Sequence, residues 1–135
     1  QMCIRDRPKV PHFHQRWDDV MGSIVRFFEE KIAMAEAAGL PRENLMLDPG
    51  IDFAKQKDDN LAIYRNLSQL TQFDRPLLVP VSRKTVIGDV LGIADPRERD
   101  AATIACLTWC MQRGGNIFRV HNVEAASQAL RCLSS

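Results

Sequence analysis

The 135-residue sequence lacks an apolar run long enough to span a bilayer, and it lacks a low-complexity tract. It also lacks an excess of charge of one sign, since 18 basic residues face 17 acidic ones and the net charge is +1. No global field therefore favours nucleic acid or a membrane surface as a partner. No secretory signal is visible, although a sequence that starts at Gln1 instead of Met would not show a signal that preceded it. A cytoplasmic location is expected.

Cysteine is scarce, and none of the four cysteines forms a CxxC pair or a Cys/His cluster with zinc spacing. Cys106 and Cys110 are four residues apart in a helical pattern, so we expect two small apolar core residues in a reducing compartment. The pair His12 and His14 is a weak metal signal because no further ligand lies nearby. No GxGxxG follows any predicted strand, which disfavours dinucleotide binding.

The order of apolar segments predicts an α/β protein with one domain over residues 8–135. Residues 1–7 show no apolar period, so we expect a disordered or foreign stretch there. The expected elements are helix 17–38 ending at Gly39, strand 45–47, helix 60–71 capped by Asp58 or Asp59, strand 77–81, a short apolar turn over 85–92, helix 96–113 opened by Asp95, strand 117–120, and helix 123–133 capped by Asn122.

Strand starts recur every 30 to 40 residues or so, which is the βαβ rhythm of a parallel sheet. The strands read as continuous aliphatic runs, as expected when protein covers both faces. Two architectures fit this rhythm, a doubly wound open sheet and part of a (β/α)8 barrel.

All three predicted strands carry an apolar body and a polar C-terminal end. Asp48 follows the first strand, and strand alternation places Ser82 with Lys84 on one face of the second and Arg119 with His121 on one face of the third. In parallel α/β folds, ligands bind at that end of the sheet. One carboxylate, two cations and a histidine suit a flat, amide-like heterocycle that carries an anionic group.

Alternatives remain for each residue taken alone. Asp48 before Pro-Gly could be only a turn former, Lys84 a solvated strand end, and Arg119 and His121 partners of helix C-termini or loop carbonyls. Ser82 beside Lys84 could imitate a Ser-Lys nucleophile pair. Phe53 could be a local packing residue or the wall of an aromatic substrate site.

Three ordered motifs carry a resemblance to a known family. The stretch LDPGIDFAK resembles the aspartate-containing loop after the sixth barrel strand of dihydropteroate synthases, SRKT resembles their seventh-strand motif, and RVHN resembles their eighth-strand motif. PRERDAATIA and the spacing also agree, and the resemblance runs from about Pro8 to the C-terminus. It implies a (β/α)8 TIM barrel, of which this chain supplies the C-terminal part, with about three parallel strands and four helices.

The resemblance implies a transferase of folate biosynthesis that condenses 6-hydroxymethyl-7,8-dihydropterin pyrophosphate with p-aminobenzoate, giving dihydropteroate and pyrophosphate. It assigns Asp48, Lys84 and Arg119 to pterin binding, and Arg119 with His121 to pyrophosphate. Lys84, Arg119 and His121 are the implied catalytic residues. The implied p-aminobenzoate pocket contains Phe53, Ser82 and Thr85.

The resemblance also implies magnesium, whose ligand is expected outside these residues, so no metal ligand is assigned within the chain. It leaves open a homodimer of the full-length protein. A barrel of this kind needs about 250 residues. We therefore expect this segment alone to be inactive and to expose strand edges and an inner face.

Three positions depart from the family pattern. Asp52 stands where the family favours glycine, Pro80 replaces a usual glycine, and Asn122 replaces aspartate. Asp52 adds a charge beside the implied amine pocket, and Pro80 cannot donate a ladder hydrogen bond. Asp52 and Pro80 leave open a non-catalytic pterin-binding paralogue. A pterin-dependent methyltransferase that shares the barrel is the other alternative, although SRKT and RVH together disfavour it.

Overall fold

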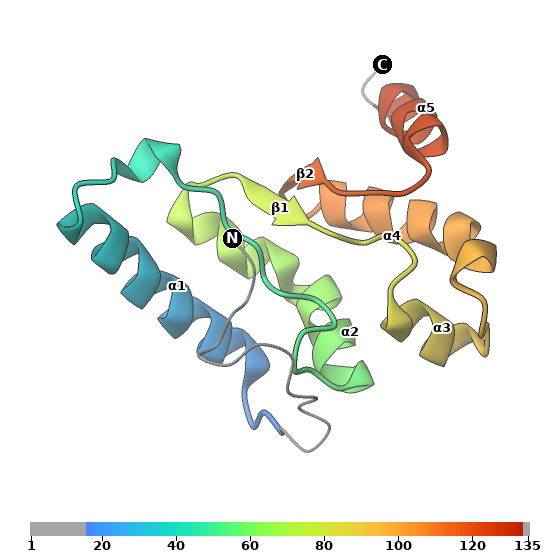
Figure 1. Ribbon diagram of the computed structural model, residues 1–135, viewed down its shortest axis with the longest axis horizontal. Helices are drawn as coiled ribbons and strands as arrows, with labels where there is room; N and C mark the ends of the chain where they lie inside the picture. Colours follow the sequence, from blue (N-terminus) through green and yellow to red (C-terminus); the bar gives the residue numbers. More distant parts are fainter. Residues whose placement is uncertain (1–15, 134–135) are drawn as a thin grey trace.

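Three short parallel segments form the centre of the computed structural model, which describes residues 16–133 (Figure 1). Strand β1 (Leu77–Val79) pairs with β2 (Gly115–Phe118) in parallel, with Leu77 opposite Gly115 and Val79 opposite Phe118. Leu47 forms an isolated parallel bridge to Leu77, so β1 lies between Leu47 and β2. The three segments run in one direction, and their C-terminal ends meet at one edge.

Five α-helices accompany these segments. They are α1 (Val20–Ala37), α2 (Lys57–Asn66), α3 (Thr85–Leu91), α4 (Asp100–Met111) and α5 (Val123–Leu133), with 3-10 segments over Arg42–Asn44, Leu67–Phe73 and Pro96–Arg99. Helices α1 and α2 lie together on one side of β1, whereas α5 stands beyond β2 at the other end of the molecule (Figure 1). No helix among residues 16–133 is long and apolar enough to cross a membrane.

The core lies between β1 and the helices α1, α2 and α4. Helix α1 contributes an apolar stripe that includes Ile24, Phe28 and Ile32, and the Phe28 ring meets the edge of Phe73 at a centroid distance of 5.6 Å. The following side chains are less than 2% exposed: Ile51, Ile63, Leu67, Leu70, Leu77, Val79, Val81, Val86, Leu107 and Cys110. Burial of apolar area on this scale is the main force that holds the segment together.

Several helix ends follow the local signals in the sequence. Gly39 adopts φ 84° directly after α1, a left-handed conformation that glycine adopts without strain. Asp95 accepts a hydrogen bond from the Arg97 N–H at 2.9 Å, and Asn122 Oδ1 accepts from the Ala125 N–H at 3.1 Å. The predicted boundaries at Gly39 and Asn122 are confirmed, whereas Asp95 caps a 3-10 segment that precedes the α-helix expected there.

Other helix boundaries were predicted wrongly. Helix α1 begins at Val20 instead of Trp17, because Asp19 caps it through the Gly22 N–H at 2.8 Å. The second helix begins at Lys57, since Gln56 is its N-cap and Asp59 lies inside the first turn as the acceptor for the Gln56 N–H at 2.8 Å. Its expected last turn, and the start of the helix expected from residue 96, are 3-10 segments.

The first two strands are shorter than predicted, and the third begins and ends two residues earlier than predicted. The segment 45–47 forms only the bridge at Leu47, where Leu47 donates to Pro76 and accepts from Leu78. Strand β1 ends at Val79 because Pro80 has no N–H for the ladder. Strand β2 covers residues 115–118, so Arg119 and His121 lie beyond its end.

The exposed apolar side chains agree with an uncovered inner face. Met46 is 52% exposed and Ile117 on β2 is 40% exposed. The prediction for residues 1–7 and the pair His12 and His14 lie outside the described residues.

The two cysteines of α4 are covered to different degrees. Cys110 is buried and Cys106 is half-buried. Burial raises the pKa of the Cys110 thiol to about 12, as expected for an inert core residue.

Candidate active site

A pocket of about 300 Å³ opens beyond the C-terminal ends of β1 and β2. Its lining consists of Pro80, Ser82, Lys84, Arg119, Val120 and His121. Four predicted site residues, from segments almost 40 residues apart in the sequence, therefore border one space. No carboxylate is among these lining residues, so the pocket presents cationic and hydroxyl donors, which suits an anionic group.

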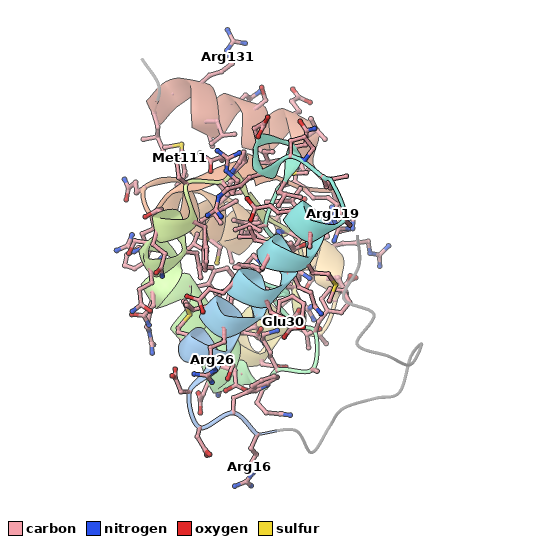
Figure 2. The ribbon with its side chains drawn as sticks, turned by 90° about the vertical axis from the view of Figure 1, so that its left-hand side faces the viewer. Arg16, Arg26, Glu30, Met111, Arg119 and Arg131 are labelled. Atoms are coloured by element: carbon pink, nitrogen blue, oxygen red, sulfur yellow. The ribbon has the colours of Figure 1, made fainter. Side chains whose placement is uncertain are left out.

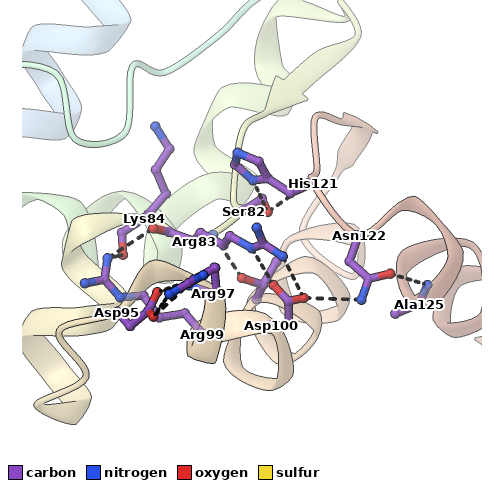
Figure 3. A network of polar contacts seen from close by, with 11 residues as sticks. Ser82, Arg83, Lys84, Asp95, Arg97, Arg99, Asp100, His121, Asn122 and Ala125 are labelled. Carbon is purple, nitrogen blue, oxygen red and sulfur yellow. Dashed lines mark hydrogen bonds and ion pairs between the residues drawn. The ribbon is translucent and has the colours of Figure 1, made fainter.

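Ser82 and His121 are directly bonded. The Ser82 hydroxyl oxygen accepts from the His121 backbone N–H at 3.1 Å and lies 2.8 Å from His121 Nδ1 (Figure 3). The hydroxyl hydrogen is available to bond the imidazole, and we assign it to Nδ1. A neutral His121 then carries its proton on Nε2, where it can serve as a donor.

Strand alternation was the wrong reason for placing Ser82 and Lys84 together. The strand ends at Val79, and Arg83 adopts φ 57°, so the chain turns between Ser82 and Lys84. Both side chains still border the pocket. The turn brings them together, and it also directs the Arg83 side chain elsewhere.

Arg83 forms an ion pair with α4 and is absent from the pocket lining. Its guanidinium donates twice to Asp100, at 2.7 and 3.0 Å, and its backbone N–H donates to Thr103 Oγ1 at 3.0 Å (Figure 3). Asn122 Nδ2 also donates to Asp100 at 3.2 Å. The hydrogen bond from Arg83 holds the pKa of the Asp100 carboxyl below its usual value. Asp100 thus joins the ends of both strands to α4.

Arg99 is a positioning residue that sequence reasoning missed. It is only 8% exposed, and its guanidinium donates to four backbone carbonyls, those of Arg83, Lys84, Ile93 and Ala94, at 2.7–3.2 Å. A cation that bonds only carbonyl groups holds the backbone on both sides of α3. Gly88 leaves space for it, since a Cβ there would lie 2.5 Å from the Arg99 guanidinium.

Lys84 extends from the end of β1 to the loop after Leu47. Its ammonium donates to the Ile51 carbonyl at 2.9 Å and lies 5.2 Å from the centre of the Phe53 ring. This geometry is a cation–π contact between two predicted site residues. Phe53 is half-buried, and its position beside Lys84 is consistent with a wall of the site.

Asp48 and Thr85 lie at the same end of the sheet but are not in the pocket lining. Asp48 directly follows the bridging Leu47, and its Oδ1 accepts the Gly50 N–H at 2.8 Å, which is the contact of a turn-forming aspartate. Thr85 is exposed as the first residue of α3. The pterin and p-aminobenzoate roles of these two residues stay predictions.

Potential metal ligands are scattered over the described part of the chain. Within residues 16–133, no group of three or more His, Cys, Asp and Glu side chains lies close enough together to hold a metal ion. These residues therefore do not fit a magnesium site of their own.

The fold and site define a segment of a (β/α)8 barrel whose ligand pocket lies at the C-terminal ends of its strands. Residues 1–121 match the pterin binding enzyme family. The chain belongs to that family, and its resemblance to TIM-barrel members is confirmed.

Known relatives make the comparison more specific. The chain is 36% identical over 134 residues to a dihydropteroate synthase from Escherichia coli K12, covering 99% of this chain and 47% of that protein. A Xanthomonas albilineans dihydropteroate synthase structure with 4-aminobenzoic acid superposes with a TM-score of 0.88 at 35% identity, covering 93% of this chain and 46% of that one. A second structure from that organism, in complex with 7,8-dihydropteroate, superposes with a TM-score of 0.86 at 36% identity. The match covers 93% of this chain and 47% of that one. The chain spans about half the length of these relatives.

Proposed function

We propose that this chain is the C-terminal part of a dihydropteroate synthase, spanning residues 8–135. The observation that carries the proposal is the single pocket bordered by Ser82, Lys84, Arg119 and His121. Relatives with that name match nearly the whole chain, which supports the same reaction.

The reaction replaces a C–O bond with a C–N bond. Pyrophosphate leaves the pterin methylene carbon with the bonding electron pair, and the lone pair of the aromatic amine then attacks the cationic carbon. The amine nitrogen loses one proton, so dihydropteroate and pyrophosphate are the products. Preorganised cations that stabilise the leaving anion lower the barrier of the first step, and two substrates bound side by side assist the second.

The pterin is assigned to Asp48, Lys84 and Arg119. A carboxylate can accept from the ring N–H and the exocyclic amine of a pterin, and an ammonium can donate to its ring carbonyl. The planar guanidinium of Arg119 can stack on the flat ring. The parallel pairing of Leu47 with β1 supports this set, since it brings Asp48 to the same sheet edge.

Pyrophosphate is assigned to Arg119 and His121, and the p-aminobenzoate pocket to Phe53, Ser82 and Thr85. The bond between Ser82 and His121 supports the first assignment, because it favours a protonated Nε2 that can donate to an anionic oxygen. The contact between Lys84 and Phe53 supports the second, because it sets an aromatic wall beside a catalytic cation.

Magnesium and a homodimer are further features of the proposal that come from the family resemblance. Magnesium would bind through a residue outside this segment, where it would neutralise the pyrophosphate. A cytoplasmic location and a homodimer of the full-length protein stay predictions.

The experiment is an assay of dihydropteroate formation by the full-length protein that carries this segment. We expect Lys84→Ala and Arg119→Ala each to lower kcat/KM by about 100- to 1,000-fold, since each removes a donor to developing charge. Lys57→Ala and Arg131→Ala are the matched controls. Lys57 is exposed on α2, and Arg131 projects from α5 at one end of the molecule, away from Arg119 (Figure 2).

Each outcome of this assay has a separate meaning. Pterin binding without turnover would favour a non-catalytic paralogue, and methyl transfer without dihydropteroate formation would favour a methyltransferase. Absence of both binding and turnover would refute the proposal. From the 135-residue chain by itself we expect no measurable synthase activity.

A further inference from the structure

Asp52 places a fixed negative charge between two loops of the candidate site. Its Oδ2 accepts the Thr85 N–H at 2.6 Å, and its Oδ1 accepts the Val86 N–H at 3.3 Å. Lys84, the N-cap of α3, makes no side-chain capping bond. Asp52, more than 30 residues earlier in the sequence, therefore caps this helix from another loop.

A buried asparagine holds Asp52 from the other side. Asn60 is 2% exposed, its Oδ1 accepts the Asp52 N–H at 2.8 Å, and its Nδ2 donates to Asp52 Oδ1 at 3.2 Å. Asn60 Nδ2 also donates to the Gln56 carbonyl at 3.0 Å, which fixes the amide itself. The Asp52 carboxylate thus accepts from the backbone N–H groups of Thr85 and Val86 and from the Asn60 side chain. These three donors fix its position.

The neighbours of Asp52 are the residues assigned to the amine pocket. Phe53 follows it in the chain, and Thr85 donates to it. The Ile51 carbonyl, directly before it, accepts from Lys84. An aromatic amine held by the proposed contacts to Phe53 and Thr85 would therefore lie beside the loop that carries this carboxylate.

We propose that Asp52 is a specificity-determining residue whose carboxylate disfavours an aromatic amine bearing an anionic group, relative to a neutral amine of the same shape. This inference rests on the proposed function. Two negative charges that share one pocket repel each other, and charges closer together than the Debye length of about 8–10 Å are only weakly screened by salt. Glycine, which the family favours here, adopts φ 66° readily and brings no charge.

The test compares two amine substrates in the full-length protein, p-aminobenzoate and its neutral analogue p-aminobenzamide. The measured quantity is the ratio of their kcat/KM values in the native protein, Asp52→Asn and Asp52→Gly. Asparagine keeps a side-chain acceptor and removes the charge, whereas glycine removes both. We expect both variants to raise the preference for p-aminobenzoate by about tenfold, through a lower KM for that substrate.

A matched control removes an equal charge elsewhere. Asp58 is exposed in the first turn of α2, and Asp58→Asn is expected to leave the substrate ratio unchanged. Hydrogen exchange of the Thr85 and Val86 amides provides a readout that is independent of turnover. We expect faster exchange in Asp52→Gly than in Asp52→Asn, since glycine offers these amides no acceptor.

The outcomes separate this inference from the proposed function. Equal changes for both amines would show that Asp52 only positions the loop, and would overturn the inference while the synthase assignment stands. If the protein binds both amines without turnover, the ratio of their dissociation constants replaces the kinetic ratio, and an unchanged ratio overturns the inference. If neither amine binds the native protein or the variants, both proposals fail.

Discussion

The side of the molecule built by α1, α2 and β1 differs from the side built by β2 and α5 in how fully its apolar side chains are covered. Helix α1 buries five residues, whereas α5 buries only Ala126. Val123 and Leu133 on α5 are 66% and 49% exposed, and α5 and β2 border an apolar groove of about 370 Å³. The difference indicates that α1, α2 and β1 find their packing partners within the chain. The side built by β2 and α5 has fewer such partners among the described residues.

The largest expected effect tests this difference with two leucines. Leu67 is fully buried, so Leu67→Ala should lower the free energy of unfolding by about 2–5 kcal/mol. Leu133→Ala, at a half-exposed position, should cost less than about 1 kcal/mol. Urea denaturation of both variants measures the two losses, and losses of equal size would contradict the comparison.

A second prediction concerns two arginines near the start of α4. Arg99→Met leaves four backbone carbonyls without their buried donor, so we expect a loss of about 2–4 kcal/mol in the free energy of unfolding. Arg97→Met is the control, because the Arg97 side chain is 82% exposed, and it should leave stability nearly unchanged. Thermal unfolding distinguishes them, and a mild Arg99 variant would refute the positioning role.

The third prediction addresses the junction between the two sides, where Asp100 binds Arg83 and Asn122. Because the pKa of the Asp100 carboxyl is lowered in the folded protein, its stabilising contribution is complete above the unfolded pKa near 4 and is lost as the pH falls through the folded pKa. Asp100→Asn should therefore be less stable than the native protein at pH 7, and the gap should shrink in acid. A gap independent of pH would argue against this linkage.

The smallest effect is expected inside the well-packed side. Tyr64 is 6% exposed, and its hydroxyl is a buried side-chain atom for which the described residues offer no hydrogen-bond partner. Burial raises the pKa of this phenol, so the group stays neutral. Tyr64→Phe should leave stability unchanged or raise it by up to about 1 kcal/mol, as measured by thermal unfolding, since it removes an unpaired polar group. A clear loss would reveal a partner for this hydroxyl.

Local signals made much of the fold predictable. Gly39, Asp95 and Asn122 mark helix boundaries through their own backbone preferences or side-chain caps, so the sequence carries them within a few residues. Helix α3 was predicted wrongly as an apolar turn. Its cap comes from Asp52, a contact between distant residues that no local pattern contains.

In the candidate site, too, features set by local sequence were predictable, whereas contacts between distant residues were not. Ser82, Lys84, Arg119 and His121, which follow two of the three predicted strands, border one pocket, whereas Asp48 after the first strand is not in its lining. The substrate roles of these residues stay predictions. Arg99 was missed because its partners are backbone carbonyls, which every residue possesses and no sequence letter marks. Strand β1 ends early at Pro80, and the chain then turns at Arg83 in a left-handed conformation; both effects depend on the surrounding chain.

The carbonyls that Arg99 binds lie on both sides of α3, at Arg83 and Lys84 before the helix and at Ile93 and Ala94 after it. One side chain thus closes this part of the chain into a non-covalent ring. Such a ring resists opening at either end alone, so α3 is expected to move as a rigid unit together with the start of α4. If a ligand displaced Lys84, the Arg99 side chain bonded to its carbonyl would move with it. The displacement would then reach Asp100, the residue after Arg99, without any loop having to unfold.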